Sequence, residues 1–203
     1  EKVLFMRIFL LILVLIFSLQ SFTKADDISE FEIEGMSIGD SALDYLSKSE
    51  IEKNKYYAYP IKEFYQSYFF TSNSENYTSV QFSIKEGDKN FILSSIEGAI
   101  HPISFSECKK RKKIIEKDIL TILPNLVVSY GEERPMWSDP ESKEITTEFY
   151  FNKTFFDGGA IRIICVDRSK RIEEEKNWVD SLRVVINSKE FNIFLDKNAN
   201  LNN

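Results

Sequence analysis

The sequence is poor in the residues that carry most acid–base and metal chemistry. It holds one histidine, His101, and two cysteines among 203 residues. Any mechanism that transfers protons through imidazole would rest on His101 alone, whose apolar neighbours are typical of a structural histidine. The chain also lacks the Gly-x-x-x-x-Gly-Lys pattern that binds phosphate and the His-Glu-x-x-His pattern that binds zinc. The sequence therefore indicates no metal site, no cofactor and no catalytic residue.

Basic residues are outnumbered by acidic ones, 26 to 32, which gives a formal net charge of −6. Nucleic-acid binding draws its affinity from a basic surface, so no nucleic-acid partner is expected. The run Lys109–Lys113 is the exception and could bind anions. It falls within a helical pattern, which instead favours the solvent-facing side of a helix, with Lys112 extending from the apolar stripe to water.

No apolar run is long enough to span a bilayer, which takes about 20 residues. The longest, Ile8–Phe17, has ten residues, follows Met6-Arg7 and precedes the sequence Thr23-Lys24-Ala25. A basic start, a short apolar stretch and small residues near a cleavage point are the pattern of a secretory signal peptide. We predict a signal peptide over residues 1–25, with residues 1–5 upstream of the first methionine. An uncleaved membrane anchor is the alternative.

The mature chain is therefore predicted to be periplasmic or secreted, with no stable membrane span after cleavage. No cysteine lies between Ser18 and Asp27 to accept the lipid of a bacterial lipoprotein. In an oxidising compartment the even cysteine count favours a disulfide between Cys108 and Cys165. Both cysteines fall on apolar stripes, one of a predicted helix and one of a predicted strand, and could meet where the two pack. Two buried free thiols are the alternative.

Hydrophobic periodicity divides the rest of the chain into helices and strands. Apolar residues recur at every third and fourth position over Ser104–Ile122, which predicts an amphipathic helix. They alternate over Val80–Ile84, which predicts a strand that pairs with Phe91–Ile96. The same criteria predict further strands at Phe31–Glu34, Lys55–Tyr59, Phe64–Thr71, Leu126–Tyr130, Ile145–Asn152, Ala160–Val166 and Leu182–Ile186. They predict short helices over Ser41–Asn54, over Arg168–Asn177 and after Ser188. The segment Gly131–Ser142 is predicted to be a polar loop.

Strands follow strands in this order, which predicts an α+β fold. We expect a mostly antiparallel sheet with the central amphipathic helix packed on one face and short helices near the N- and C-termini. Residues 26–203 form one domain in this interpretation, with two halves of a helix and a meander each, 26–103 and 104–197. The tail 198–203 is expected to fray.

Aromatic residues gather between Tyr56 and Phe70. Tyrosine combines an apolar ring with a polar hydroxyl, so rings on an exposed strand face could hold a small ligand or a protein partner. We identify Tyr57, Tyr65 and Phe69 as the candidates for such a surface. The alternative is that the same rings fill the core of the sheet.

The leader and the segment Phe31–Ser41, followed by Leu43–Leu46, resemble the opening of small uncharacterised exported proteins from compact, AT-rich marine bacterial genomes. The similarity is weaker around Cys108 and Cys165. This resemblance implies export and carries no known activity.

The leading hypothesis is a non-catalytic envelope or periplasmic domain that binds a protein or a small ligand. A hydrolase that acts on an envelope substrate is the alternative. It would use Asp167, Glu148 or Glu173 as its acidic residues and requires two or three of these carboxylates to converge in one cleft.

Overall fold

The structure is a computed structural model that describes residues 28–71, 76–136, 139–151 and 158–201; the predicted signal peptide lies outside these ranges. Within them, eight strands form an antiparallel sheet in the order β3-β4-β5-β10-β9-β8-β6, with β7 paired to β8. The strands are β3 (Phe64–Phe70), β4 (Ser79–Lys85), β5 (Leu93–Ile100), β6 (Val127–Tyr130), β7 (Arg134–Met136), β8 (Asp139–Tyr150), β9 (Ala160–Asp167) and β10 (Ser181–Asn187). The helices are α2 (Lys48–Lys53), α3 (Phe105–Ile122), α4 (Lys170–Lys176) and α5 (Lys189–Ala199).

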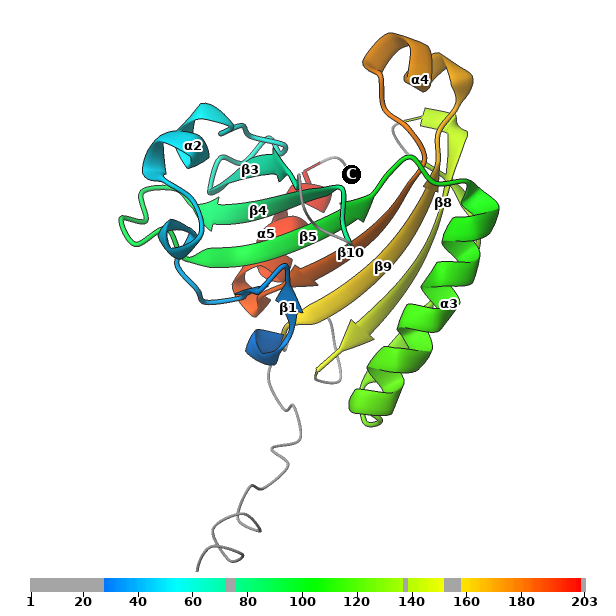
Figure 1. Cartoon of the computed structure of the whole chain (residues 1–203), viewed down its shortest axis with the longest axis horizontal. Coiled ribbons are helices and arrows are strands. Elements are labelled where there is room, and N and C mark those ends of the chain that lie inside the picture. Colours follow the sequence, from blue (N-terminus) through cyan, green and yellow to red (C-terminus); the bar gives the residue numbers. More distant parts are fainter. Residues whose placement is uncertain (1–27, 72–75, 137–138, 152–157, 202–203) are drawn as a thin grey trace, which may run out of the picture.

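Helices cover both faces of the sheet, as Figure 1 shows: α3 crosses one face, and α5 lies behind the other. We call these the α3 face and the α5 face. The predicted α+β class, with a mostly antiparallel sheet and a central helix packed on it, is confirmed. Short helices stand near both ends of the described chain, as expected.

Helix α3 begins and packs as its sequence predicts. The side chain of Ser104 accepts a hydrogen bond from the Glu107 backbone N–H and caps the helix. Cys108, one turn further on, is fully buried and bonded to Cys165 of β9. The predicted disulfide is therefore confirmed, and it ties α3 to the middle of the sheet.

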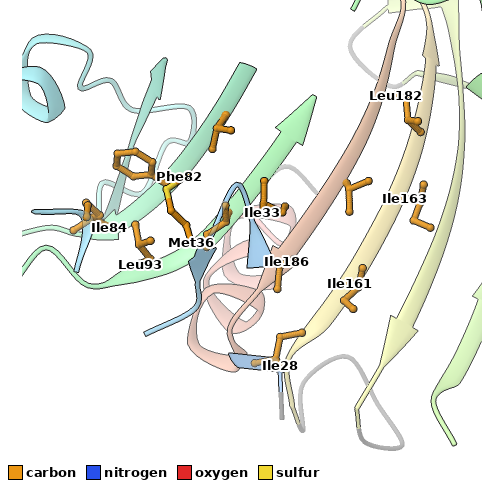
Figure 2. Packing of buried hydrophobic residues seen from close by; sticks show 14 of the residues in the cluster. Ile28, Ile33, Met36, Phe82, Ile84, Leu93, Ile161, Ile163, Leu182 and Ile186 are labelled. Atoms are coloured by element: carbon orange, nitrogen blue, oxygen red, sulfur yellow. The ribbon is translucent and has the colours of Figure 1, made fainter. Parts of the chain in front are cut away.

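The main apolar core lies on the α3 face, where alternate residues of neighbouring strands stand in register. In β10 and β9 these are Leu182 opposite Cys165 and Ile186 opposite Ile161. A small hairpin, β1 (Glu32–Ile33) and β2 (Met36–Ser37), covers the part of this face that α3 leaves open. Figure 2 shows Ile33 and Met36 pointing from the hairpin into the core.

Three local predictions differ from the structure. Residues 55–59 form no strand, and their backbone pairs with β3 at one isolated bridge, between Tyr56 and Gln66. The predicted polar loop Gly131–Ser142 contains β7 and the first part of β8, because backbone pairing forms this hairpin although its side chains are mostly polar. Helix α5 continues to Ala199, since the Asn198 side chain is buried and accepts a hydrogen bond from the Ile61 N–H at 3.1 Å.

Strand β10 joins the two parts of the sheet. On one side it pairs with β5, which precedes α3 in the chain, and on the other with β9, which follows α3. The proposed halves 26–103 and 104–197 therefore share one continuous sheet. Its centre consists of strands that are buried on both faces.

Candidate ligand-binding pocket

Helix α5 covers one end of the α5 face. Phe191 and Phe194 of α5 pack there on Phe64, the first residue of β3. At the other end of the same face the strands surround a pocket with a volume of about 520 Å³. Its walls combine aromatic rings with polar side chains. The rings are those of Tyr56, Tyr59, Tyr68, Phe70, His101 and Trp178. The polar side chains are those of Ser79, Gln81, Glu97, Arg168, Asn177 and Arg183.

Strand register brings the floor of the pocket together. Tyr68, Gln81 and Glu97 stand opposite one another on β3, β4 and β5. Phe70 and Ser79 form the next row towards the end of the sheet, where Ala99 stands opposite Arg183 of β10. Side chains of residues two apart share a face, so both rows point into the pocket.

A charge pair lies at the base of the pocket. The Arg183 guanidinium donates from Nε to Glu97 Oε1 at 2.6 Å and from Nη2 to Oε2 of the same carboxylate. The Glu97 side chain is 13% exposed and that of Arg183 is 31% exposed, so the pair is reached from the pocket. The Glu97 charge raises the pKa of Arg183, which keeps the guanidinium charged.

The rings form a continuous wall. Tyr56, Tyr68, Phe70 and His101 make successive edge-to-face contacts, with ring centroids 5.9 to 6.3 Å apart. The Tyr56 hydroxyl donates to Gln81 Oε1 at 2.5 Å, and burial raises the pKa of Tyr56 to about 12. The Tyr56 ring is therefore neutral at physiological pH, and the wall offers apolar faces with polar edges.

His101 contributes one contact of chemical interest. Its Nε2 lies 3.1 Å from Ser79 Oγ, which is the distance of a nucleophile and a base in a hydrolase. Such a base needs a third group that orients its second nitrogen. Within the described ranges, His101 has no hydrogen bond to a carboxylate. Ser79 and His101 therefore supply polar groups to the pocket wall, and they do not form a catalytic triad with a described carboxylate.

The spacing Gly35-x-Ser37-x-Gly39 matches the nucleophile elbow of α/β-hydrolases. In the structure Ser37 belongs to the β1–β2 hairpin on the α3 face, and not to a turn between a strand and a helix. His101 and its Ser79 partner line the pocket on the opposite face. Ser37 therefore has no imidazole base beside it, and the nucleophile–base pair that a nucleophile elbow needs is not formed there.

The structure does not bring the three carboxylates of the hydrolase alternative together. Glu148 lies on the α5 face and pairs with Arg162 at 2.8 Å. Asp167 ends β9 on the other face, where burial and the nearby charge of Asp180 raise its pKa. Glu173 is exposed on α4.

The aromatic surface predicted from the sequence is divided by the pleat of β3. Tyr65 is only 5% exposed on the α3 face, and Phe69 packs there on Phe82. Tyr57 is exposed but outside the pocket, and its hydroxyl donates to Glu86 at 2.5 Å. The pocket instead uses the alternate residues, Tyr68 and Phe70.

The charged pocket residues were not singled out in the sequence, although a signal exists. Arg183 interrupts the apolar run Leu182–Ile186, and Glu97 follows Ile96 in an otherwise apolar or small-residue strand. A charged residue inside such a strand requires a partner, because an unpaired buried charge is costly. The opposite charges of Glu97 and Arg183 meet that requirement for each other.

A second recess, of about 430 Å³, lies on the α3 face beside the β1–β2 hairpin. Tyr77, Ile114 and Ile115 line it, with charged residues at the rim. In the described part of the chain, no cluster of three or more metal-ligating side chains is found. None of the described helices is long and apolar enough to cross a membrane.

We compared the chain with protein-family models, curated proteins and solved structures, and none of them matches.

Proposed function

We propose that this protein is an exported, non-catalytic domain that holds a small organic ligand in the pocket on the α5 face. The observation that carries the proposal is the convergence of half-exposed rings and a partly exposed charge pair in one recess. Its volume lies within the roughly 300–1,000 Å³ typical of small-molecule sites. An apolar wall with a few placed polar groups is the usual composition of such sites.

Export is supported by two independent features. The first is the predicted leader of residues 1–25, and the second is the disulfide between Cys108 and Cys165, since such bonds persist mainly in oxidising compartments. Expression of the full chain in a bacterial host, followed by mass measurement of the product in the periplasm, tests this point. Loss of the leader from periplasmic protein supports export, and full-length product retained in the cytoplasm contradicts it.

Binding can be tested with neutral probes that match the rings. We expect indole and 3-phenylpropionamide to shift the backbone amide NMR signals of β3, β4 and β10 at the pocket end. Phe70 is 69% exposed, so Phe70→Ala should weaken these probes about fivefold without harming the core.

Tyr130 of β6 is 63% exposed and lies outside the pocket, so Tyr130→Ala is the matched control. It should leave both affinities unchanged. Shifts spread over both faces, or equal affinities in the two variants, would contradict the proposed function.

A further inference from the structure

The pocket contains a second guanidinium, that of Arg168, whose surroundings differ from those of Arg183. Its Nε is buried and has no hydrogen-bond partner, and its Nη1 lies 3.2 Å from the weakly accepting Sδ of Met136. Asp180 accepts from the Arg168 backbone N–H at 2.7 Å. Among the residues that the structure describes, no carboxylate forms an ion pair with the Arg168 side chain.

The Arg168 guanidinium also contacts a ring of the pocket. The carbon of the guanidinium lies 5.3 Å from the centre of the Trp178 ring, in a cation–π contact. A guanidinium that stacks its flat face on a ring keeps its N–H groups in the plane, where they can still donate. Those in-plane donors match the two oxygens of a carboxylate in a bidentate pair.

The net charge of the residues that line the pocket also favours an anionic ligand. Two guanidiniums and one carboxylate line the pocket, so it carries a net positive charge on a chain whose net charge is −6. Burial and the like charge of Arg183 lower the pKa of Arg168, while the charges of Asp139, Glu144 and Asp180 act in the opposite direction without pairing with its side chain. Glu97 is already engaged by Arg183 through both of its oxygens. A bound anion would offset the repulsion between the two guanidiniums.

The rest of the pocket selects an apolar body. Trp178 is 54% exposed, Tyr68 is 43% exposed and Phe70 is 69% exposed, and all three line the same recess as Arg168. An inorganic anion would leave these rings in water. A molecule with a ring or a short apolar chain attached to its acid group would cover them.

Resting on the proposed function, we infer that the pocket takes a small organic acid. Its carboxylate pairs with Arg168, and its apolar body lies against Tyr68, Phe70 and Trp178. The pocket therefore discriminates an acid from its neutral analogue of the same shape.

Matched probes test this discrimination. 3-Phenylpropionate and 3-phenylpropionamide differ only in the acid group, and both can be titrated into the full chain at neutral pH with amide NMR as the readout. Because a hydrogen bond to a charged group contributes more than a neutral one, the acid should bind at least about tenfold more tightly than the amide. Arg168→Gln should reduce that ratio to about one, mainly by weakening the binding of the acid.

Two further variants complete the experiment. Arg168→Lys keeps the charge but loses the planar fork, so an intermediate ratio is expected. Arg111→Gln removes an exposed arginine of α3 that lies outside the pocket, and it should leave the ratio at its wild-type value. Thermal unfolding of each variant establishes that it is folded.

The outcomes separate the two proposals. If the amide binds in the pocket as tightly as the acid, or if Arg168→Gln leaves the ratio unchanged, the organic-acid inference is overturned and the proposed function stands. If neither probe shifts the pocket signals at millimolar concentration, both are overturned.

Discussion

At the scale of single residues, two buried charged side chains, Lys112 and Asp139, have partners on a different element or a neighbouring turn. Lys112 of α3 is 6% exposed, although it belongs to the basic run Lys109–Lys113. Its ammonium contacts Glu116 and the hydroxyl of Thr147 on β8. The sequence places Lys112 on the apolar stripe of the helix, but only the structure shows which strand faces it.

We predict that Glu116→Ala lowers the free energy of unfolding by about 3 kcal/mol, because it leaves the buried Lys112 ammonium without its counter-charge. Urea denaturation measures the change. Asp118→Ala on the exposed side of the same helix should change stability by less than about 0.5 kcal/mol. Equal effects of the two variants would show that the Lys112 pair is energetically unimportant.

Asp139 joins α4 to the start of β8. Hydrogen bonds from Ser142 and Ser169, together with Arg171, lower the pKa of Asp139 from 3.8 to about 2. A carboxyl whose pKa is lower in the folded state stabilises the fold above its unfolded pKa. This stabilisation is lost as the pH falls through the folded value.

The expected stability of the wild type therefore falls between pH 4 and pH 2, whereas Asp139→Asn should be less stable at pH 7 and show a shallower fall over that window. Chemical denaturation at a series of pH values provides the measurement. Asp118→Asn serves as the exposed control and should follow the wild-type profile. A variant profile parallel to that of the wild type would contradict this role of Asp139.

At the scale of elements, the sequence predicts those pieces whose side chains repeat with a clear period. Helix α3 and the strand pair β4–β5 were predicted because one face of each is apolar and the other is polar. The hairpin of β7 and the start of β8 was missed because its side chains are mostly polar and give no apolar stripe. Its paired residues, such as Arg134 and Glu144, are close in the sequence, but their polar side chains give no alternating pattern.

The disulfide between α3 and β9 closes a loop of 57 residues, which contains β6, β7 and β8. In the chain-entropy model, such a closure stabilises the fold by about 4 kcal/mol. We expect the variant Cys108→Ala/Cys165→Ala to lose about that much in urea denaturation. Wild type measured in dithiothreitol should approach the variant, and coincident curves for all three conditions would contradict a stabilising bridge.

At the scale of the whole molecule, the choice of pocket residues depends on which face each helix covers. Strand β3 carries rings on both faces, so its sequence alone does not distinguish Tyr65 and Phe69 from Tyr68 and Phe70. The register with β4 places the first two over the α3-face core. Register is a long-range property, and this is why the sequence identified the aromatic segment but not the face that lines the pocket.

The continuous sheet predicts one cooperative folding unit. Ile186 of β10 is 2% exposed and stands between Ile96 of β5 and Ile161 of β9. Ile186→Ala should lower the free energy of unfolding by about 2–4 kcal/mol. Hydrogen exchange of amides in both β4 and β9 should accelerate by the same factor.

Val127→Ala on the short edge strand β6, 45% exposed, is the control and should leave exchange in β4 unchanged. If Ile186→Ala accelerates exchange on one side of β10 only, the two parts of the sheet unfold independently.

The central position of β10 also constrains how the protein is made. Residues 181–187 are synthesised late, yet β5 and β9 both depend on them for their backbone partners. A nascent polypeptide that has not reached this segment carries two separate three- or four-stranded pieces, each with an unpaired inner edge open to aggregation. A sheet that is completed only after synthesis is compatible with translocation of an extended chain. A chaperone that shields the unpaired edges of β5 and β9 would prevent incomplete chains from associating with one another.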